Sequence, residues 1–310
     1  MTKDEIFEHF DRLVVELGSQ NKACRAVGVS APIIVQLRKG EYPGDTQKQL
    51  DKLASYFAVK AETNDVYEEI RYAPISTSKK VYSTIRSCHI KGGFAVVTGD
   101  AGIGKTKAIT KYAEDNSGTT VVITINPCQK SAKAVIKLLA MKLNIPLHQS
   151  TDDMWFSIAD KLHDGMVVIV DEAQLLTYQA IETLRSLADH FDNCGQTLGV
   201  ALIGNNGIRE RIEGKTREIY RQVNNRTWQR PFLQTADVKI DDIRLLFPLL
   251  EPNGSEIRFL LKIAQSVEGI RGAVRLFSNA YDNEHYDLMG LAEMAKSMRI
   301  DLRGVDLKSI

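Results

Sequence analysis

Residues 99–106 have the types and spacing that hold the phosphate groups of a nucleotide. They are Gly99, Asp100, Ala101, Gly102, Ile103, Gly104, Lys105 and Thr106, the complete pattern G-x-x-x-x-G-K-T of a Walker A loop. Glycines let backbone N–H groups curl around phosphate oxygens, and Lys105 brings a compact positive charge to the β- and γ-phosphates. The Thr106 hydroxyl is a ligand for Mg²⁺. The loop therefore predicts binding of ATP with Mg²⁺.

Two carboxylates follow an apolar run further along the chain. The run 167–170 leads into Asp171 and Glu172, about 65 residues beyond the Walker A loop. Such an ending is by itself compatible with a simple helix cap. At this spacing it predicts a Walker B motif, because open α/β sheets bind ligands at the carboxyl ends of their strands. We expect Asp171 to complete the Mg²⁺ shell and Glu172 to polarise the attacking water.

Two more polar residues are candidates for a hydrolysis site. Asn205 follows the apolar run 198–203, where P-loop ATPases place a sensor-1 residue that orients water; the alternative is a turn-forming Gly-Asn-Asn. Arg275 ends the segment Gly272-Ala273-Val274-Arg275, which resembles the sensor-2 signature of a helical lid. We expect Arg275 to reach the γ-phosphate, the alternative being a surface arginine.

A group of arginines follows Asn205. It consists of Arg217, Arg221, Arg226 and Arg230. An arginine from a neighbouring subunit can stabilise the charge of a phosphoryl-transfer transition state. We expect Arg226 to have this role, with Arg230 as the second choice. A solvated basic face is an equally good interpretation of the same residues.

Strand-like and helix-like patterns alternate around these motifs. Apolar runs of strand length lie at 94–98, 119–125, 166–170 and 198–203, and helical periodicity lies between them at 105–114, 131–143 and 178–190. Continuous apolar strands alternating with helices predict a parallel sheet that is covered by helices on both faces. Only helical periodicity remains beyond residue 235. The expected organisation is therefore an N-terminal helical domain (1–62), a polar linker (63–80), an α/β core (81–235) and a helical lid (236–310).

The N-terminal zone contains the pattern of a helix-turn-helix at residues 20–40. A short helix with Ala23 and Ala26 facing the core leads to a turn at 28–30 and a second helix opened by Ser30 and Pro32. We expect Val29, Ile34 and Leu37 to face the core. The side chains predicted to face solvent or a DNA groove are Ala31, Val35, Gln36, Arg38 and Lys39. We take Gln36, Arg38 and Lys39 as candidate DNA contacts, and a protein–protein module remains the alternative.

A second candidate DNA-binding surface lies in the core. Their spacing of i, i+3 and i+7 puts Lys130, Lys133 and Lys137 on one face of the helix that follows the second strand. In a ring or spiral of subunits this face could line a DNA channel, with Lys130, Ser131 and Lys133 in contact. The alternative is an ordinary solvated helix face.

Composition narrows the class of protein without naming a ligand. The chain is 44% hydrophobic and 25% charged, which excludes a collagen, a coiled coil and a wholly disordered chain. No run approaches the roughly 18 apolar residues of a membrane span, and the N-terminus lacks the pattern of a signal peptide. We therefore expect a cytoplasmic protein with no membrane partner. The net charge of +1 is uninformative, so a DNA-binding surface must be local.

Taken together, the motifs resemble those of the phage Mu B transposition proteins and their Mu-like prophage relatives, which are AAA+ ATPases. The shared order begins with a helix-turn-helix ending in Lys39-Gly40-Glu41-Tyr42-Pro43-Gly44-Asp45 and continues through a linker and G-x-x-G-x-G-K-T. It then passes through T-I-N-P, I-V-D-E-A, L-I-G-N and G-A-x-R. The resemblance implies an AAA+ core with a helical lid and an N-terminal helix-turn-helix domain.

The resemblance also implies a function. The expected protein is an ATPase that polymerises on double-stranded DNA as a filament or ring with little sequence preference. It would select target DNA and activate a transposase for strand transfer, and hydrolysis would drive its release and underlie target immunity. Residues 152–165 hold only Lys161 and His163 as basic side chains, which leaves the DNA-contacting role to Lys130 and Lys133. Two alternatives remain: a helicase-loader or insertion-sequence helper ATPase, and a nucleotide-gated repressor.

Overall fold

The computed structural model describes residues 1–64, 72–213 and 220–302. The chain divides into two compact units, Met1–Glu68 and Glu69–Ile310. This boundary lies within the predicted linker, but residues 76–80 are not linker. They are the start of helix α5, where Thr77 donates to the carbonyl of Ile103 (2.9 Å) and Ser78 to that of Ala73 (2.9 Å). Because these hydroxyls are satisfied when buried, a polar sequence is part of the core here.

The first unit is helical in its described part. Its elements are α1 (Lys3–Leu17), α2 (Gln20–Val27), α3 (Ala31–Lys39) and α4 (Thr46–Asn64). A capping box between Thr2 and Glu5 begins α1, and Gly18 ends it in the left-handed conformation. The predicted core residues Val29, Ile34 and Leu37 are buried, but Ala26 is exposed. Cys24 and Val27 are buried instead, so the inward face of α2 is rotated from the predicted one.

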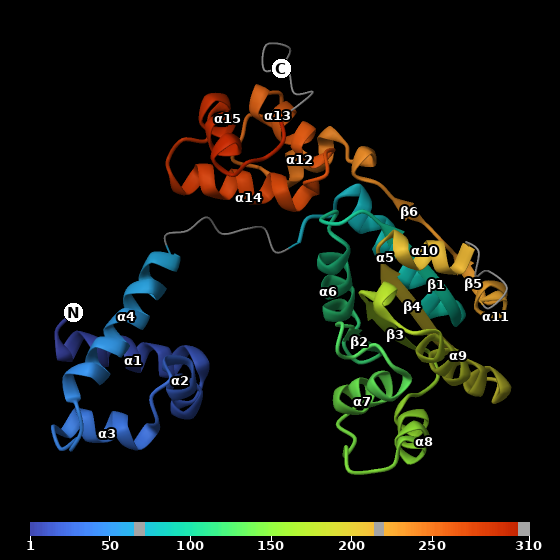
Figure 1. The fold of residues 1–310 in the computed structure, drawn as a ribbon, viewed down its shortest axis with the longest axis horizontal. Coiled ribbons are helices and arrows are strands. Elements are labelled where there is room, and N and C mark those ends of the chain that lie inside the picture. The colour runs from blue at the N-terminus through green and yellow to red at the C-terminus, as the bar shows by residue number, and fades with distance from the viewer. Residues whose placement is uncertain (65–71, 214–219, 303–310) are drawn as a thin grey trace. The chain divides into compact units, whose positions relative to one another are not determined.

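The second unit is built on a parallel sheet. Its strands are β1 (Gly93–Gly99), β2 (Thr120–Thr124), β3 (Met166–Asp171), β4 (Leu198–Gly204), β5 (Thr227–Gln229) and β6 (Phe232–Leu233). Their order is β2-β3-β4-β1-β5, and β6 also pairs with β1, at the carboxyl end of that strand (Figure 1). Among the described residues, the strands of this sheet pair in parallel. All four predicted strands are present, and their carboxyl ends therefore meet at one edge.

Alternate side chains of the strands enter two different cores. Val97, Ile169 and Ile203 pack with α5 and α6 on one face. Val96, Val170 and Leu202 pack with α7, α8 and α9 on the other. Because both faces are buried, nearly every strand position must be apolar, which explains the continuous apolar runs. The fold is the predicted α/β core with helices on both faces.

The helices of this core lie before and between the strands. They are α5 (Ser76–Lys91), α6 (Lys105–Asp115), α7 (Ala132–Lys142), α8 (Thr151–Lys161), η1 (Ala173–Leu175), α9 (Tyr178–Asn193), α10 (Asn206–Glu213) and α11 (Arg221–Asn225). The sequence pattern did not predict α8. Ser150 caps it by accepting from the N–H of Asp153 (3.1 Å), and Met154 and Ile158 are buried one turn apart.

The C-terminal part of the second unit is a helical lid. It contains η2 (Thr235–Asp237), α12 (Ile240–Leu246), α13 (Ser255–Ala264), α14 (Gly269–Asp282) and α15 (Leu288–Ser297). Asp242 of α12 accepts from the N–H of Ser76 (2.6 Å), and the N–H of Arg271 donates to the carbonyl of Gly102 (3.0 Å). The lid therefore contacts both α5 and the Walker A loop. Within the part of the chain that the structure describes, every helix is too short or too polar to cross a membrane.

Candidate active site

The Walker A loop connects the end of β1 to the start of α6. Gly102 and Gly104 have φ angles of +74° and +89°, a region that favours glycine. A Cβ on Gly99 would lie 2.4 Å from the carbonyl oxygen of Leu233, so a side chain cannot fit there either. These glycines leave the backbone free to turn at the N-terminus of α6. That geometry suits a phosphate group, because unpaired N–H groups and the helix dipole both favour an anion.

Lys105 is folded over this loop. Its Nζ donates to the carbonyl oxygens of Gly99 (2.9 Å) and Asp100 (2.6 Å). Burial lowers the pKa of the Lys105 ammonium, while the neighbouring Asp171 and Glu172 act in the opposite direction. A partly desolvated cation at this point strengthens the attraction for phosphate oxygens.

Thr106 and Asp171 bring two oxygen ligands together from distant parts of the sequence. Thr106 Oγ1 donates to Asp171 Oδ2 (2.9 Å), and the N–H of Glu172 donates to Asp171 Oδ1 (2.9 Å). Asp171 is only 4% exposed, and burial raises the pKa of its carboxyl. A hydroxyl beside a carboxylate fits Mg²⁺, which prefers oxygen ligands and commonly uses only one or two from the protein. These residues therefore suit the predicted metal.

Glu172 follows Asp171 at the end of β3 in a strained backbone conformation, with a φ of +58°. Gln174, which no sequence motif indicated, connects it to the end of β4. Gln174 Nε2 donates to Glu172 Oε2 (2.5 Å), and its Oε1 accepts from the N–H of Asn205 (3.1 Å). One amide thus joins the Walker B carboxylate to the sensor-1 candidate.

Asn205 makes the capping contact of a turn-forming residue and leaves its amide nitrogen available for the predicted sensor-1 role. Its Oδ1 accepts from the N–H of Gly207 (2.9 Å) and so caps α10, as a turn-forming residue would. The amide Nδ2 is then the end of the side chain that can donate to a water or a phosphate. Asn205 therefore suits the predicted role of a residue that orients water, and Gln174 connects it to Glu172.

The lid presents Arg271 to the Walker A loop. A Cβ on Gly102 would lie 3.2 Å from Cβ of Arg271, and the positive charge of Arg271 contributes to lowering the pKa of Lys105. Arg275 lies four residues further along α14, about 6 Å at 1.5 Å per residue. The sequence motif indicated Arg275, whereas the structure places Arg271 against the Walker A loop. The sequence could have indicated Arg271 through its spacing of four residues from Arg275, because this spacing puts both arginines on one face of the helix.

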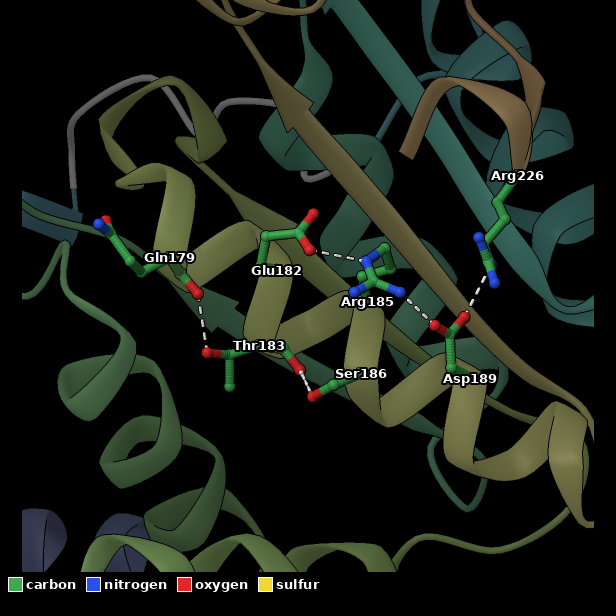
Figure 2. A network of polar contacts seen from close by, with 7 residues as sticks. All are labelled: Gln179, Glu182, Thr183, Arg185, Ser186, Asp189 and Arg226. Atoms are coloured by element: carbon green, nitrogen blue, oxygen red, sulfur yellow. Dashed lines mark hydrogen bonds and ion pairs between the residues drawn. The ribbon is translucent and has the colours of Figure 1, made fainter. Parts of the chain in front are cut away.

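Arg226 and Arg230 lie on the edge of the sheet beside β1. The N–H of Phe94, at the start of β1, donates to the carbonyl of Arg226 (3.0 Å). The Walker A loop is at the other end of β1, about 20 Å away at roughly 3.3 Å per residue. Arg230 donates to the carbonyl of Asn224 (2.5 Å), whereas Arg226 forms an ion pair with Asp189 of α9 (2.7 Å, Figure 2). Arg217 is outside the described residues, and Arg221 begins α11.

The core lysines do not form the predicted helical stripe. Lys133 and Lys137 are exposed on α7, but α7 begins at Ala132, so Lys130 precedes the helix. Ser131 is the N-cap, and its hydroxyl accepts from the N–H of Ala134 (3.3 Å). Ser131 ends the extended chain before α7, which is why a helical spacing counted from Lys130 is wrong.

The candidate DNA contacts of the first unit lie on α3. Gln36, Arg38 and Lys39 are exposed there. Arg38 forms an ion pair with Asp11 of α1, and its guanidinium carbon lies 5.1 Å from the ring centroid of Phe7. Because Asp11 lies outside the 20–40 motif, the sequence pattern did not reveal this partial neutralisation. Lys39 is the more available cation.

Comparisons with known proteins agree with this fold and site. Residues 89–212 match the AAA domain family. Together with the Walker A loop and the adjacent carboxylates, this match defines an ATPase of the AAA+ class. The protein is 26% identical to the Mu-like prophage FluMu DNA transposition protein B of Haemophilus influenzae, over 85% of this chain and 90% of that one. The resemblance to the phage Mu B transposition proteins is confirmed.

Two further similarities extend the comparison. The ATP-dependent target DNA activator B of Escherichia phage Mu is 24% identical, over 82% of this chain and 78% of that protein. The ORC2 protein of Aeropyrum pernix, solved as ADPNP–ADP complexes, has a TM-score of 0.50 and 14% identity. That likeness covers 72% of this chain and 66% of ORC2, and it shows the fold alone.

Proposed function

We propose that this ATPase binds double-stranded DNA in an ATP-dependent way, assembles on it, and activates target DNA for a transposase. The names of its relatives support this proposal, since they are a DNA transposition protein B and an ATP-dependent target DNA activator B. The main structural support for the proposal is the hydrogen bond between Thr106 and Asp171, because it completes a nucleotide site, and such a site can control assembly. Hydrolysis then releases the protein from DNA.

Each part of the site has a role in this scheme. Lys105 and the loop N–H groups hold the phosphates, and Thr106 and Asp171 hold Mg²⁺. The metal supplies charge neutralisation at the phosphate oxygens. Glu172 orients the attacking water, with the Asn205 amide as a donor beside it. Arg271, rather than Arg275, reads the γ-phosphate from the lid.

Arg226 serves the site of a neighbouring subunit. The length of β1 separates it from its own Walker A loop, so its guanidinium cannot reach the phosphates bound by the same chain. An arginine that acts from a neighbour makes hydrolysis depend on assembly and contributes about 10³ to 10⁵ in rate in other NTPases. Arg230 is the alternative, although its contact with Asn224 directs it back to its own chain.

DNA contacts come from two surfaces. In the first unit, exposed Gln36 and Lys39 of α3 would meet the phosphate backbone, with Arg38 in a lesser role because Asp11 neutralises it. In the second unit, Lys133 with Lys130 before α7 would face DNA in the assembly. Contacts of this kind favour binding with little sequence preference.

Footprinting and electron microscopy on random linear DNA test the proposal. With ATP and Mg²⁺ we expect continuous protection of long arbitrary tracts and a regular filament or ring on the DNA. Protection of one short site would favour the repressor interpretation. Discrete rings that load a helicase, without any effect on transposase, would favour the loader interpretation. A matched Lys105→Ala protein should show neither protection nor filaments.

A further inference from the structure

A chain of charged side chains leads from α9 to Arg226. Glu182, Arg185 and Asp189 lie on one face of α9, three and four residues apart (Figure 2). Arg185 Nε donates to Glu182 Oε2 (2.8 Å), and Arg185 Nη1 donates to Asp189 Oδ2. Asp189 Oδ1 is then left for Arg226, whose Nε lies 2.7 Å away. Asp189 thus contacts Arg185 through Oδ2 and Arg226 through Oδ1.

The burial of these groups differs along the chain. The side chains of Glu182, Arg185 and Asp189 are 20–21% exposed, whereas that of Arg226 is 40% exposed. Partly buried ion pairs are screened less by salt than exposed ones. The inner three side chains therefore form a stiff support, and Arg226 is the member that can reach beyond the surface.

The contact uses only part of the Arg226 guanidinium. It runs through Nε, as an ion pair without the alignment of a hydrogen bond. The terminal nitrogens Nη1 and Nη2 carry four of the five N–H donors, and these are the ones that bind phosphate bidentately. A pocket of about 270 Å³ opens beside the pair, and Asp189, Arg226 and Trp228 are among its lining residues. A group from outside can thus approach the guanidinium.

We propose that Asp189 is a positioning residue for Arg226, and that Arg185 and Glu182 hold Asp189 in place. The inference rests on the proposed role of Arg226 in a neighbouring subunit. A long arginine side chain loses conformational entropy when it binds. Because Asp189 already restricts the Arg226 side chain before assembly, less entropy is lost when Arg226 reaches the neighbouring site. Asp189 itself touches neither nucleotide nor reacting atoms.

The test compares hydrolysis by Asp189→Asn and Arg226→Ala with that of the wild type, in the presence of DNA and ATP. We expect Arg226→Ala to lower kcat at least 100-fold and Asp189→Asn to lower it about tenfold, because the amide leaves the guanidinium unanchored. The Kd for ATP, measured on the full chain, should not change in either variant. The double variant should be no slower than Arg226→Ala alone, since the two residues act as a unit.

Mixing subunits separates positioning from a structural defect. Glu172→Gln subunits carry an intact Asp189–Arg226 pair, so they can serve the intact Glu172 of an Asp189→Asn neighbour. We expect the mixture to regain activity above the sum of the two variants. If Asp189→Asn damaged its own nucleotide site or its folding, mixing would not rescue it, and the proposal would be wrong.

Asp192→Asn is the matched control. Asp192 is exposed, lies three residues further along α9 and lines the same pocket, but has no ion pair with Arg226. We expect wild-type kcat from it. Equal losses in Asp189→Asn and Asp192→Asn would indicate a general charge effect and overturn the positioning role. Wild-type kcat in Arg226→Ala would instead contradict the proposed function of Arg226 itself.

Discussion

Gln174 lies between Glu172 and Asn205, with its Nε2 2.5 Å from Glu172 Oε2 and its Oε1 3.1 Å from the N–H of Asn205. This side chain couples the carboxyl ends of β3 and β4. A Cβ on Gly204 would lie 2.3 Å from Gln174 Oε1, so the glycine before Asn205 makes room for it. The arrangement gives the candidate general base a fixed neighbour.

Gln174→Glu should therefore alter the pH dependence of hydrolysis. A second carboxylate next to Glu172 makes ionisation of the pair less favourable. We expect the acid limb of the kcat profile to move to higher pH and kcat at pH 7 to fall about tenfold. Steady-state hydrolysis between pH 5 and 9 measures both. Gln179→Glu adds the same charge at an exposed position of α9 and should leave the profile unchanged; an identical shift in both would argue against the local contact.

Lys105→Ala should abolish the effect of ATP on DNA binding. The variant removes the partly buried cation that faces the Walker A carbonyls, and with it the ATP-bound state that lets subunits pack along DNA. Fluorescence anisotropy with labelled DNA should give the same affinity with and without ATP. Lys111→Ala removes a charge from a surface ion pair on the same helix and should retain the response. Full ATP stimulation in Lys105→Ala would show that the loop does not gate binding.

Asp171→Asn should stabilise the fold while hydrolysis falls at least 100-fold. Burial raises the pKa of Asp171, so its charged form costs stability at neutral pH, and the amide carries no such cost. Thermal unfolding without nucleotide should show a higher Tm for the variant at pH 7. The difference should shrink as the pH falls toward the raised pKa, because the wild-type carboxyl then becomes neutral too. A lower Tm at pH 7 would contradict the burial argument.

His89 should make stability depend on pH. Its ring lies between the Tyr112 hydroxyl (2.7 Å) and the carbonyl of Gly165 (2.8 Å), and burial lowers its pKa below 6.5. As the pH falls, His89 therefore takes up a proton in the unfolded chain before it does so in the folded chain. The free energy of unfolding should decrease as the pH drops below about 6.5. The free energy of unfolding, measured with urea between pH 5 and 7, should change less steeply with pH in His89→Gln than in the wild type. His148→Gln, at an exposed site, should keep the wild-type slope.

Residues 69–310 should fold and hydrolyse ATP without the first unit. The boundary after Glu68 separates two sets of contacts, and each unit has its own apolar core. We expect a cooperative thermal transition and ATP binding within about twofold of the full chain. DNA affinity should fall, with a shallower salt dependence, because the cations of α3 are removed. Loss of ATP binding would place part of the nucleotide site in the first unit.

Much of the nucleotide site is determined by local sequence. The Walker A loop needs glycines where the backbone has positive φ or where a Cβ would collide, and this requirement is visible as G-x-x-x-x-G-K-T. The strands can also be predicted from the sequence, because burial on both faces of the sheet requires continuous apolar runs. Asp171 could be predicted from its place at the end of such a run.

The remaining features depend on contacts between distant residues. The sequence does not show that Gln174 meets Asn205, that Arg271 lies against Gly102, or that Asp11 neutralises Arg38. Nor does it show which arginine meets Asp189, since α9 and α11 are brought together only when β4 and β5 flank β1. Polar side chains have no periodic signature of their pairing, because one hydrogen bond or ion pair constrains a single position. The sequence alone therefore determined the phosphate-binding chemistry and the layers of the fold, and the tertiary structure decided which polar side chains support it.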